Sequence, residues 1–492
     1  MTKKEQAADR QFLKIKTRSI KGVVALGSRT AALQLVTFLA TFALTILLNP
    51  EEYGVFFLIS ALINFFTYFS DIGLAAALIQ KKKKLSQDDL NTTFLIQQFL
   101  VVSLVILAWI VSSRVSRWYG LSVSGLWLYR ALAFSLLLSS LKTIPSIILE
   151  RQLLFSRLVL PQVFETLAFY SVAVFLAWRG FGVNSFSYAV LARGVLGLVT
   201  IYWLVPWRPS LRLNWRVAKR LFSFGVPFQL NSLLALIKDD LLIAFLGKIL
   251  PLQAVGYIGW AQKWALFPFR IVADNLIRIT FPVYARLQKF PGKLKAAVEK
   301  SIYAVAVLVF PALTGLALIA DKFVVLFPNY EKWQPAVLAL RFFCINGLFA
   351  SISTSLTNML AAIGKIKINL KLMVFWTTLT WILTPVLVFK IGYNGAALAS
   401  ALVASTSFIT VYLAKKELPF RFFSRVWPPA LSSLIMALGF YALAPLLTGS
   451  LLRLGLLIFI SAIIYLIAML AFNRQQLYHE IKSIRGGFSK ND

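Results

Sequence analysis

The stretch FPFRIVADNLIRITFPVY, from Phe267 to Tyr284, places Arg270, Asp274 and Arg278 inside a long apolar tract. Apolar runs of about 20 residues, each long enough to cross a bilayer as a helix, recur on both sides of it. The chain of 492 residues is 59% hydrophobic and 14% charged, whereas soluble domains are about a quarter charged. The sequence therefore predicts an all-α, polytopic integral membrane protein, and the three charges need an explanation.

Apolar windows bounded by charges, prolines and glycines predict fourteen transmembrane helices. They begin near residues 22, 54, 93, 126, 159, 184, 222, 255, 301, 335, 372, 394, 428 and 454. The basic N-terminal segment leads straight into a full-length span, so no cleavable signal peptide is expected.

Lysine and arginine are distributed unevenly over the connections between these helices. Alternate connections, starting with segment 1–21, hold 34 of the 51 basic residues, and the intervening connections hold 8. Cytoplasmic loops are enriched in Lys and Arg, so both termini are expected on the cytoplasmic side of the inner (plasma) membrane. The same rule explains the net charge of +33 without a nucleic-acid partner. The run Lys81–Lys84 is interpreted as a topology anchor, with contact to anionic membrane lipids as the alternative.

Several kinds of chemistry lack the residues that they need. Cys344 and His479 are the one cysteine and the one histidine of the chain, so a His/Cys metal site and a Cys/His or Ser/His catalytic dyad are not expected. No phosphate-binding glycine motif is found. The sequence predicts a protein that is not an enzyme and that uses no cofactor.

An internal repeat divides the chain. GVNSFSYAVLARGVLGLVTIYWL, from Gly182, aligns without gaps with GYNGAALASALVASTSFITVYLA, from Gly392. The two copies lie six spans apart and run in the same membrane direction, which predicts two parallel halves that frame a central substrate site. A chance likeness between helices rich in small residues is the alternative. The predicted division is a basic N-terminus (1–21), an N-lobe of helices 1–6 (22–220), a C-lobe of helices 7–12 (221–425), two additional helices (426–472) and a cytoplasmic tail (473–492).

The charges of the opening stretch share one helix face. Arg270, Asp274 and Arg278 are spaced i, i+4, i+8, and Lys263 joins the same stripe seven residues earlier. A charge at the bilayer centre costs on the order of 2.5–3.5 kcal/mol, so these side chains are expected to face a watery cavity or one another. One acid leaves the stripe net positive. The alternative is a structural ion-pair network.

Polar stripes on the first, second and seventh spans are expected to line the same cavity. Cavity cations that bind substrate are predicted at Arg29, Lys263, Arg270 and Arg278. Ion-coupling carboxylates are predicted at Asp71, Asp239, Asp240 and Asp274. Other polar cavity positions are Thr37, Thr41, Asn64, Thr67, Asn231 and Lys238. Five isolated charges on other spans are interpreted as helix–helix contacts or as side chains that reach the interface, namely Arg130, Lys142, Glu165, Arg193 and Arg341.

The predicted spans contain nine basic and five acidic residues. A transporter of cationic drugs should show the opposite bias. A net-positive cavity suits an anionic ligand, and the planar fork of arginine suits phosphate oxygens in particular.

The segment EEYGVFFLISALINFFTYFSDIGLAAALIQKKKKLSQDDLNTTF, from Glu51 to Phe94, resembles the polysaccharide transporter branch of the multidrug/oligosaccharidyl-lipid/polysaccharide exporter superfamily. IPSIILERQLLFSRL, RGFGVNSFSYAVL and GVPFQLNSLLALIKDDLLIAFLGKIL are similar to the same branch, and the likeness covers nearly the whole chain. The resemblance implies fourteen helices in two lobes and the flipping of undecaprenyl-pyrophosphate-linked oligosaccharide. Relatives that flip cell-wall precursor carry cavity arginines on the first, second and eighth spans. Arg29 lies on the first predicted span, and Arg270 and Arg278 lie on the eighth. The second predicted span carries Asp71 in place of an arginine.

Together these observations predict a flippase that works by alternating access on a lipid-linked glycan, in contact with membrane lipids. A polysaccharide polymerase and glycosyltransferases are the further partners considered. Two alternatives remain open: a cation-coupled drug or small-molecule antiporter of the same fold, and a membrane scaffold for polysaccharide assembly that transports nothing.

Overall fold

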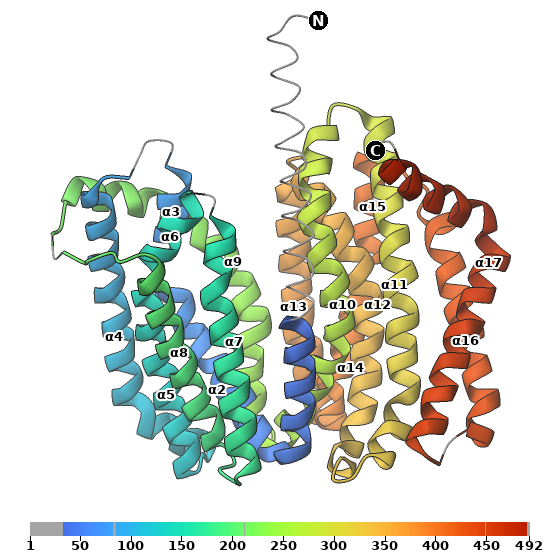
Figure 1. Cartoon of the computed structure of the whole chain (residues 1–492), viewed down its shortest axis with the longest axis horizontal. Helices are drawn as coiled ribbons and strands as arrows, with labels where there is room; N and C mark the ends of the chain where they lie inside the picture. The colour runs from blue at the N-terminus through green and yellow to red at the C-terminus, as the bar shows by residue number, and fades with distance from the viewer. Residues whose placement is uncertain (1–32, 82–84, 153, 211, 448, 490–492) are drawn as a thin grey trace, which may run out of the picture. The chain divides into compact units, whose positions relative to one another are not determined.

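The computed structural model describes residues 33–81, 85–152, 154–210, 212–447 and 449–489, and this part of the chain is helical with no strand. The side chains of 155, 224–232, 274, 278 and 473–489 are outside the description. The chain divides into two compact units, Met1–Leu236 and Ile237–Asp492. In each unit, long helices run side by side (Figure 1). The prediction of an all-α polytopic membrane protein is confirmed.

The first unit contains the helix Leu33–Leu47 and seven helices that follow it. These are α2 (Pro50–Phe69), α3 (Leu74–Gln80), α4 (Gln87–Tyr119), α5 (Val123–Leu141), α6 (Thr143–Arg151), α7 (Phe155–Trp178) and α8 (Asn184–Leu204). The next helix, α9 (Trp215–Ile249), passes through the division between the units.

The second unit continues from the end of α9. It contains α10 (Leu252–Leu287), α11 (Pro291–Leu326), the 3-10 helix η1 (Glu331–Ala336), α12 (Val337–Ala362), α13 (Ile366–Ile391), α14 (Asn394–Ser405), α15 (Phe408–Glu417), α16 (Phe423–Leu447) and α17 (Leu451–Ser489).

Thirteen of the fourteen predicted spans coincide with helices of the described chain, and the described helix Leu33–Leu47 lies within the first, which is predicted to begin near residue 22. Eleven helical segments are long and apolar enough to cross a membrane by length and composition. The described part of the helix Leu33–Leu47 is apolar but shorter than these eleven segments. Helices α9 and α10 carry the charges predicted to line the cavity. Neither α9 nor α10 is among the eleven.

Local signals explain where several helices begin and end. Ser86 caps α4 by accepting a hydrogen bond from the Asp89 backbone N–H at 3.2 Å, and the Asp89 carboxylate accepts one from the Ser86 N–H at 2.8 Å. Gly120 ends α4 in the left-handed conformation, at φ 63°, which glycine adopts without a steric penalty.

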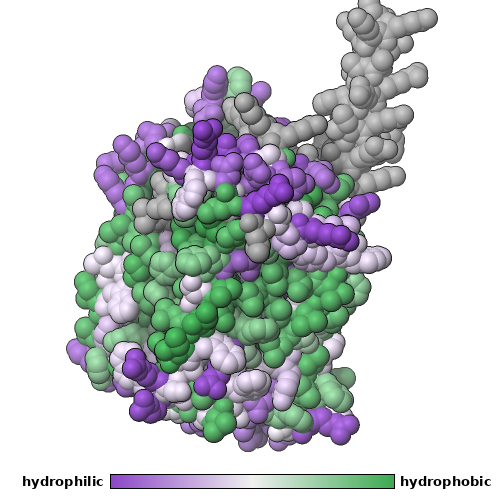
Figure 2. Space-filling model, turned by 90° about the vertical axis from the view of Figure 1, so that its left-hand side faces the viewer, coloured by the Kyte–Doolittle hydropathy of each residue, from purple (hydrophilic) through white to green (hydrophobic). Residues whose placement is uncertain are grey.

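The surface of the first unit is that of a membrane protein. On the face drawn in Figure 2, hydrophobic residues form a band between two polar ends. Large apolar side chains such as Phe99, Ile110 and Trp203 are 70%, 69% and 76% exposed. A soluble protein rarely exposes a contiguous apolar surface of this kind, whereas lipid tails solvate it.

The repeat predicted from the sequence has matching backbone geometry in the two units. Gly182 precedes α8 at φ 54°, and Gly392 precedes α14 at φ 66°. Two residues later, Asn184 and Asn394 each begin the following helix. Both glycines adopt the left-handed region because the chain reverses there between two packed helices, α7 and α8 or α13 and α14.

The second span is interrupted where the sequence predicted a continuous stripe. Helix α2 ends at Phe69, and the chain turns through Ile72 and Gly73 at φ 45° and 72° before α3 begins. The Asp71 carboxylate accepts a hydrogen bond from the Ala75 N–H at 3.1 Å, inside the first turn of α3. The polar stripe expected on the second span therefore ends within α2 at Thr67, and Asp71 lies beyond the end of that helix.

Candidate functional site

Helix α10 is continuous over 36 residues and carries the charged stripe. Its packed side contains Ala265, Ala273 and Tyr284, all buried. Lys263 and Arg270 are exposed. At 100° per residue, the four charged positions of the stripe lie within about 80° of one another, Ala265 lies on the opposite side of the helix, and Ala273 and Tyr284 lie along one flank of the stripe. The packing of α10 thus leaves the stripe off the core of its unit.

Two packing contacts hold α10 against the rest of its unit. Near one end of the helix, Trp260 stacks on Trp333 of η1 with ring centroids 5.4 Å apart. Near the other end, the Asn358 amide of α12 donates to the Thr280 hydroxyl at 2.8 Å. These contacts hold the helix against its unit along most of its length, because they lie about 20 residues or roughly 30 Å apart.

Three predicted residues have described backbones and undescribed side chains. Asp274 and Arg278 occupy helical positions of α10, and Asn231 occupies one of α9. Arg29 lies outside the described residues. Their roles remain predictions.

A polar pocket lies inside the second unit, at the end of α9 that belongs to it. Its cavity of about 100 Å³ is lined from five helices, by residues that include Lys238 and Asp239 of α9, Gln262 of α10, Asn346 of α12, Thr384 of α13 and Ser400 of α14. A second cavity of about 220 Å³ shares Lys238 and Asn346. The Lys238 side chain thus borders both cavities.

Hydrogen bonds orient the walls of this pocket. The Asn346 amide donates to the Ser400 carbonyl and hydroxyl oxygens at 2.9 and 2.8 Å. The Trp381 indole N–H of α13 donates to the Ile237 carbonyl at 3.0 Å, one residue before Lys238. The backbone that carries the lysine is therefore tied to α13.

The two charges of the pocket face each other. The Lys238 ammonium lies 3.0 Å from the Asp239 carboxylate, and these side chains are 29% and 61% exposed. Water screens an ion pair with this exposure, so the pair contributes little to stability. A carboxylate and an ammonium next to a hydroxyl-lined cavity can instead hold or exchange a small ion or a proton. Asp240 is half-buried and has an interaction partner of its own.

The polar residues predicted on the first two spans have different environments. Thr41 is buried, at 3% exposure, and Thr37 is half-buried. Asn64 and Thr67 are exposed on α2, and the Thr67 hydroxyl donates to the Ile63 carbonyl of its own helix at 2.9 Å. A hydroxyl that donates to a carbonyl of its own helix, as that of Thr67 does, needs no further hydrogen-bond partner, so it can lie next to either apolar or polar groups.

The isolated charges of other spans contact neighbouring helices, as the sequence predicted. The Glu165 carboxylate of α7 lies 2.5 Å from the Lys142 ammonium and 3.7 Å from the Arg193 guanidinium. The Arg130 guanidinium donates to the Ser112 hydroxyl at 3.1 Å. Arg341 pairs with Asp321 at 3.5 Å.

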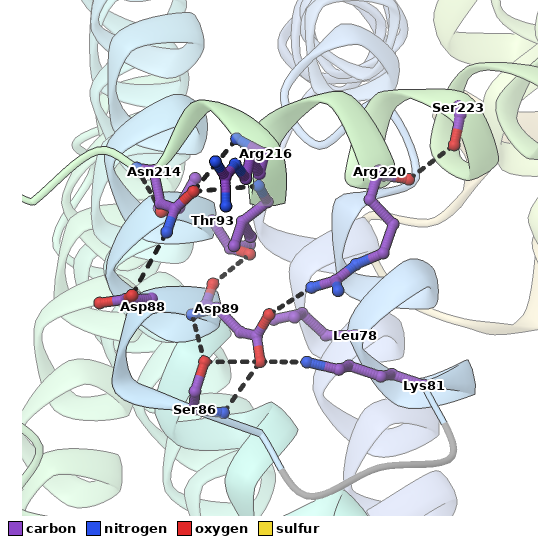
Figure 3. A network of polar contacts seen from close by, with 12 residues as sticks. Leu78, Lys81, Ser86, Asp88, Asp89, Thr93, Asn214, Arg216, Arg220 and Ser223 are labelled. Atoms are coloured by element: carbon purple, nitrogen blue, oxygen red, sulfur yellow. Dashed lines mark hydrogen bonds and ion pairs between the residues drawn. The ribbon is translucent and has the colours of Figure 1, made fainter.

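The sequence did not reveal a polar cluster at one end of the first unit (Figure 3). The buried Asp89 carboxylate of α4 pairs with the Lys81 ammonium and, at 2.5 Å, with the Arg220 guanidinium of α9. The Asn214 amide donates to Asp88 at 3.3 Å, and the Asn214 backbone N–H donates to the Thr92 hydroxyl at 3.0 Å. These contacts anchor the first turns of α9 to α4.

The family model described as "Polysaccharide biosynthesis protein" matches residues 43–338. An uncharacterized membrane protein in the cps region of Klebsiella pneumoniae is 27% identical over 390 residues, which cover 78% of each chain. The probable low-salt glycan biosynthesis flippase Agl15 of Haloferax volcanii is 22% identical over 432 residues, covering 85% of this chain and 88% of that protein.

Solved structures share the fold. The lipid II flippase MurJ in an inward closed conformation matches with a TM-score of 0.75 and 16% identity over 91% of this chain and 100% of that one. An inward-facing multidrug resistance MATE family transporter of the MOP superfamily matches with a TM-score of 0.62 and 16% identity, over 78% and 95% of the two chains. Because the family model matches more than half of the 492 residues of this chain, the chain belongs to the polysaccharide biosynthesis protein family.

Proposed function

We propose that the protein is a flippase that moves a polyprenyl-pyrophosphate-linked oligosaccharide across the plasma membrane by alternating access. Family membership and a relative named as a glycan biosynthesis flippase support this function. So does the lipopolysaccharide biosynthesis protein WzxC of Escherichia coli, which is 25% identical over about half of each chain. The glycan would be a lipopolysaccharide, O-antigen or exopolysaccharide repeat unit.

The observation that carries the proposal is the charged stripe of α10. Arg270 is exposed on α10, and Arg278 occupies a position within about 80° of it around the same helix. Exposed arginines within a membrane-spanning unit need water or an anion to solvate them. A pyrophosphate offers paired oxygens that match the guanidinium fork. In this proposal the two arginines hold the pyrophosphate, with Lys263 and Arg29 assisting.

Energy for directional transport would come from an ion gradient, from the membrane potential or from consumption of the product. Asp239 is the coupling carboxylate that the geometry favours, since it lines the polar pocket beside Lys238. Asp71 is less suited because its carboxylate accepts a hydrogen bond from the backbone of α3. Asp274 would instead balance the arginines of its own stripe.

The proposal also includes topology and partners. Both termini would lie on the cytoplasmic side, where the enriched basic loops would face anionic lipid. Glycosyltransferases would supply the lipid-linked glycan on that side, and a polymerase would consume it on the other.

Transport by purified protein in liposomes tests this function. A fluorescent polyprenyl-pyrophosphate oligosaccharide is placed in both leaflets, and an impermeant quencher reports the outer-leaflet fraction over time. A fluorescent phospholipid is the control for nonspecific scrambling. The proposal expects glycan-lipid movement above that of empty liposomes and no movement of the control lipid. A rate equal to that of empty liposomes, under gradients of either direction, favours the scaffold instead, and exchange of a cationic dye against sodium or protons favours the antiporter.

A further inference from the structure

An apolar groove of about 580 Å³ lies in the second unit, between α15 and the start of α16. We call it the α15 groove. Phe310 of α11 and Ile352 of α12 form its buried floor, each 7% exposed. Its rim includes Phe408 and Tyr412 of α15, which are 68% and 59% exposed. The groove is therefore open at the surface of the unit and apolar from floor to rim.

One lysine lines the groove and a second follows it in the sequence. Lys415 lines the groove at the last turn of α15, and the Lys416 ammonium lies 4.6 Å from the centre of the Tyr412 ring. Glu417, the carboxylate on the same turn, is engaged by Lys365 at 2.8 Å. In the described chain, no carboxylate lies within 4.0 Å of the Lys415 or Lys416 ammonium. Two uncompensated positive charges thus stand at one end of an otherwise apolar channel.

The length of the groove matches one leaflet of a bilayer. From Ser407 to Lys415, its wall on α15 spans eight residues, or about 12 Å of helix. A hydrocarbon leaflet is about 15 Å thick, half of a core of about 30 Å. A chain that starts at the lysines and follows the groove would reach most of the way to the bilayer centre.

We propose that the α15 groove binds one acyl chain of an anionic phospholipid, with the lipid phosphate at Lys415 and Lys416. Apolar burial along the groove supplies affinity for the chain, and the two ammonium groups supply the preference for a negative head group. A neutral phospholipid with the same chains would fill the groove without that preference. The site is distinct from the α10 stripe, and its occupancy does not depend on transport.

Native mass spectrometry of the full chain in detergent tests the proposal, with phosphatidylglycerol and phosphatidylcholine of identical acyl chains as probes. The wild type should retain phosphatidylglycerol in preference to phosphatidylcholine. Lys415→Ala and Lys416→Ala should each weaken phosphatidylglycerol binding about fivefold, the equivalent of ~1 kcal/mol per surface cation, and leave phosphatidylcholine unchanged. Lys367→Ala is the matched control, because this exposed lysine of the same unit lies outside the groove.

A second variant separates the groove from the cations. Val411→Trp adds bulk at the half-buried wall of the groove and should reduce retention of both lipids. The exposed lysine variants keep the test decisive if this variant does not fold. Equal retention of the two lipids by the wild type would overturn the proposal, as would an equal loss in Lys367→Ala. Displacement of phosphatidylglycerol by polyprenyl phosphate at one-to-one stoichiometry would also overturn it and assign the groove to the transported lipid.

Discussion

Replacing Asp89 by asparagine should destabilise the first unit, because the carboxylate joins three segments of the chain. Its side chain is 1% exposed and accepts from the Lys81 ammonium, from Arg220 at 2.5 Å, and from the Ser86 N–H and hydroxyl at 2.8 and 2.9 Å. Asparagine has nearly the same shape, but it carries no charge and turns one acceptor oxygen into a donor. At least one cation then faces an N–H group.

The magnitude follows from the exposure of the partners. Removing one member of a fully buried ion pair costs about 3–5 kcal/mol. Here the Lys81 and Arg220 side chains are 20% and 54% exposed, so water compensates part of the loss, more so at the arginine. We therefore expect Asp89→Asn to lower the free energy of unfolding by about 3 kcal/mol.

Equilibrium unfolding of the purified protein in mixed detergent micelles measures this effect. Asp88→Asn is the matched control: the neighbouring carboxylate is exposed, and the one contact drawn for it in Figure 3 is a 3.3 Å hydrogen bond that the Asn214 amide donates. It should change stability by less than about 0.5 kcal/mol. Equal effects of the two substitutions, or a change below about 1 kcal/mol for Asp89→Asn, would show that the cluster is not a specific anchor of α9.

Three further predictions concern packing, topology and transport. Gly395→Ala should abolish stable folding of the second unit, because the added Cβ would lie 2.2 Å from a backbone carbonyl oxygen of α13, and expression with gel filtration measures this loss. Gly292→Ala is the control and should be tolerated in the same assay, because its new Cβ would meet no neighbouring atom within 4 Å. An impermeant thiol reagent should fail to label single cysteines in segment 286–300, around the turn between α10 and α11, in intact cells with a Cys344→Ser background, and labelling there would reverse the proposed topology. Asp274→Asn should insert normally yet export less glycan, since it removes a titratable group and leaves two arginine positions uncompensated; full export at normal expression would remove this residue from the mechanism.

The sequence was informative where the bilayer imposes a strong constraint. A span requires a long apolar run, and a charge inside one is costly, so both the spans and the α10 stripe stood out. The repeat was visible because Gly182 and Gly392 occupy turns that need a left-handed backbone. These features depend on residues close together in the chain.

The polar pocket and the Asp89 cluster depend on residues far apart in the chain. Asp89 and Arg220 are separated by 131 positions, and nothing local marks them as partners. Asn346 and Ser400 line the pocket, but such residues are common in membrane helices, where they join neighbouring helices. A polar stripe along one face also requires a continuous helix. The turn at Ile72 and Gly73 interrupts the second span, so the stripe predicted there is shorter than expected.

The central claim is that the arginines of α10 bind a pyrophosphate, and affinity measures it most directly. Purified wild type, Arg270→Ala, Arg278→Ala and the two Arg→Lys variants are titrated with a pyrophosphate-linked polyprenol, with the uncharged polyprenol as the control ligand. Each alanine variant should lose about 1.5–3 kcal/mol, the range of a charge-assisted hydrogen bond, or roughly ten- to a hundredfold in affinity. Lysine should restore only part of that loss, because it keeps the charge without the planar fork. Folded alanine variants that bind the pyrophosphate lipid as tightly as the wild type would contradict the account and leave the stripe a structural feature of α10.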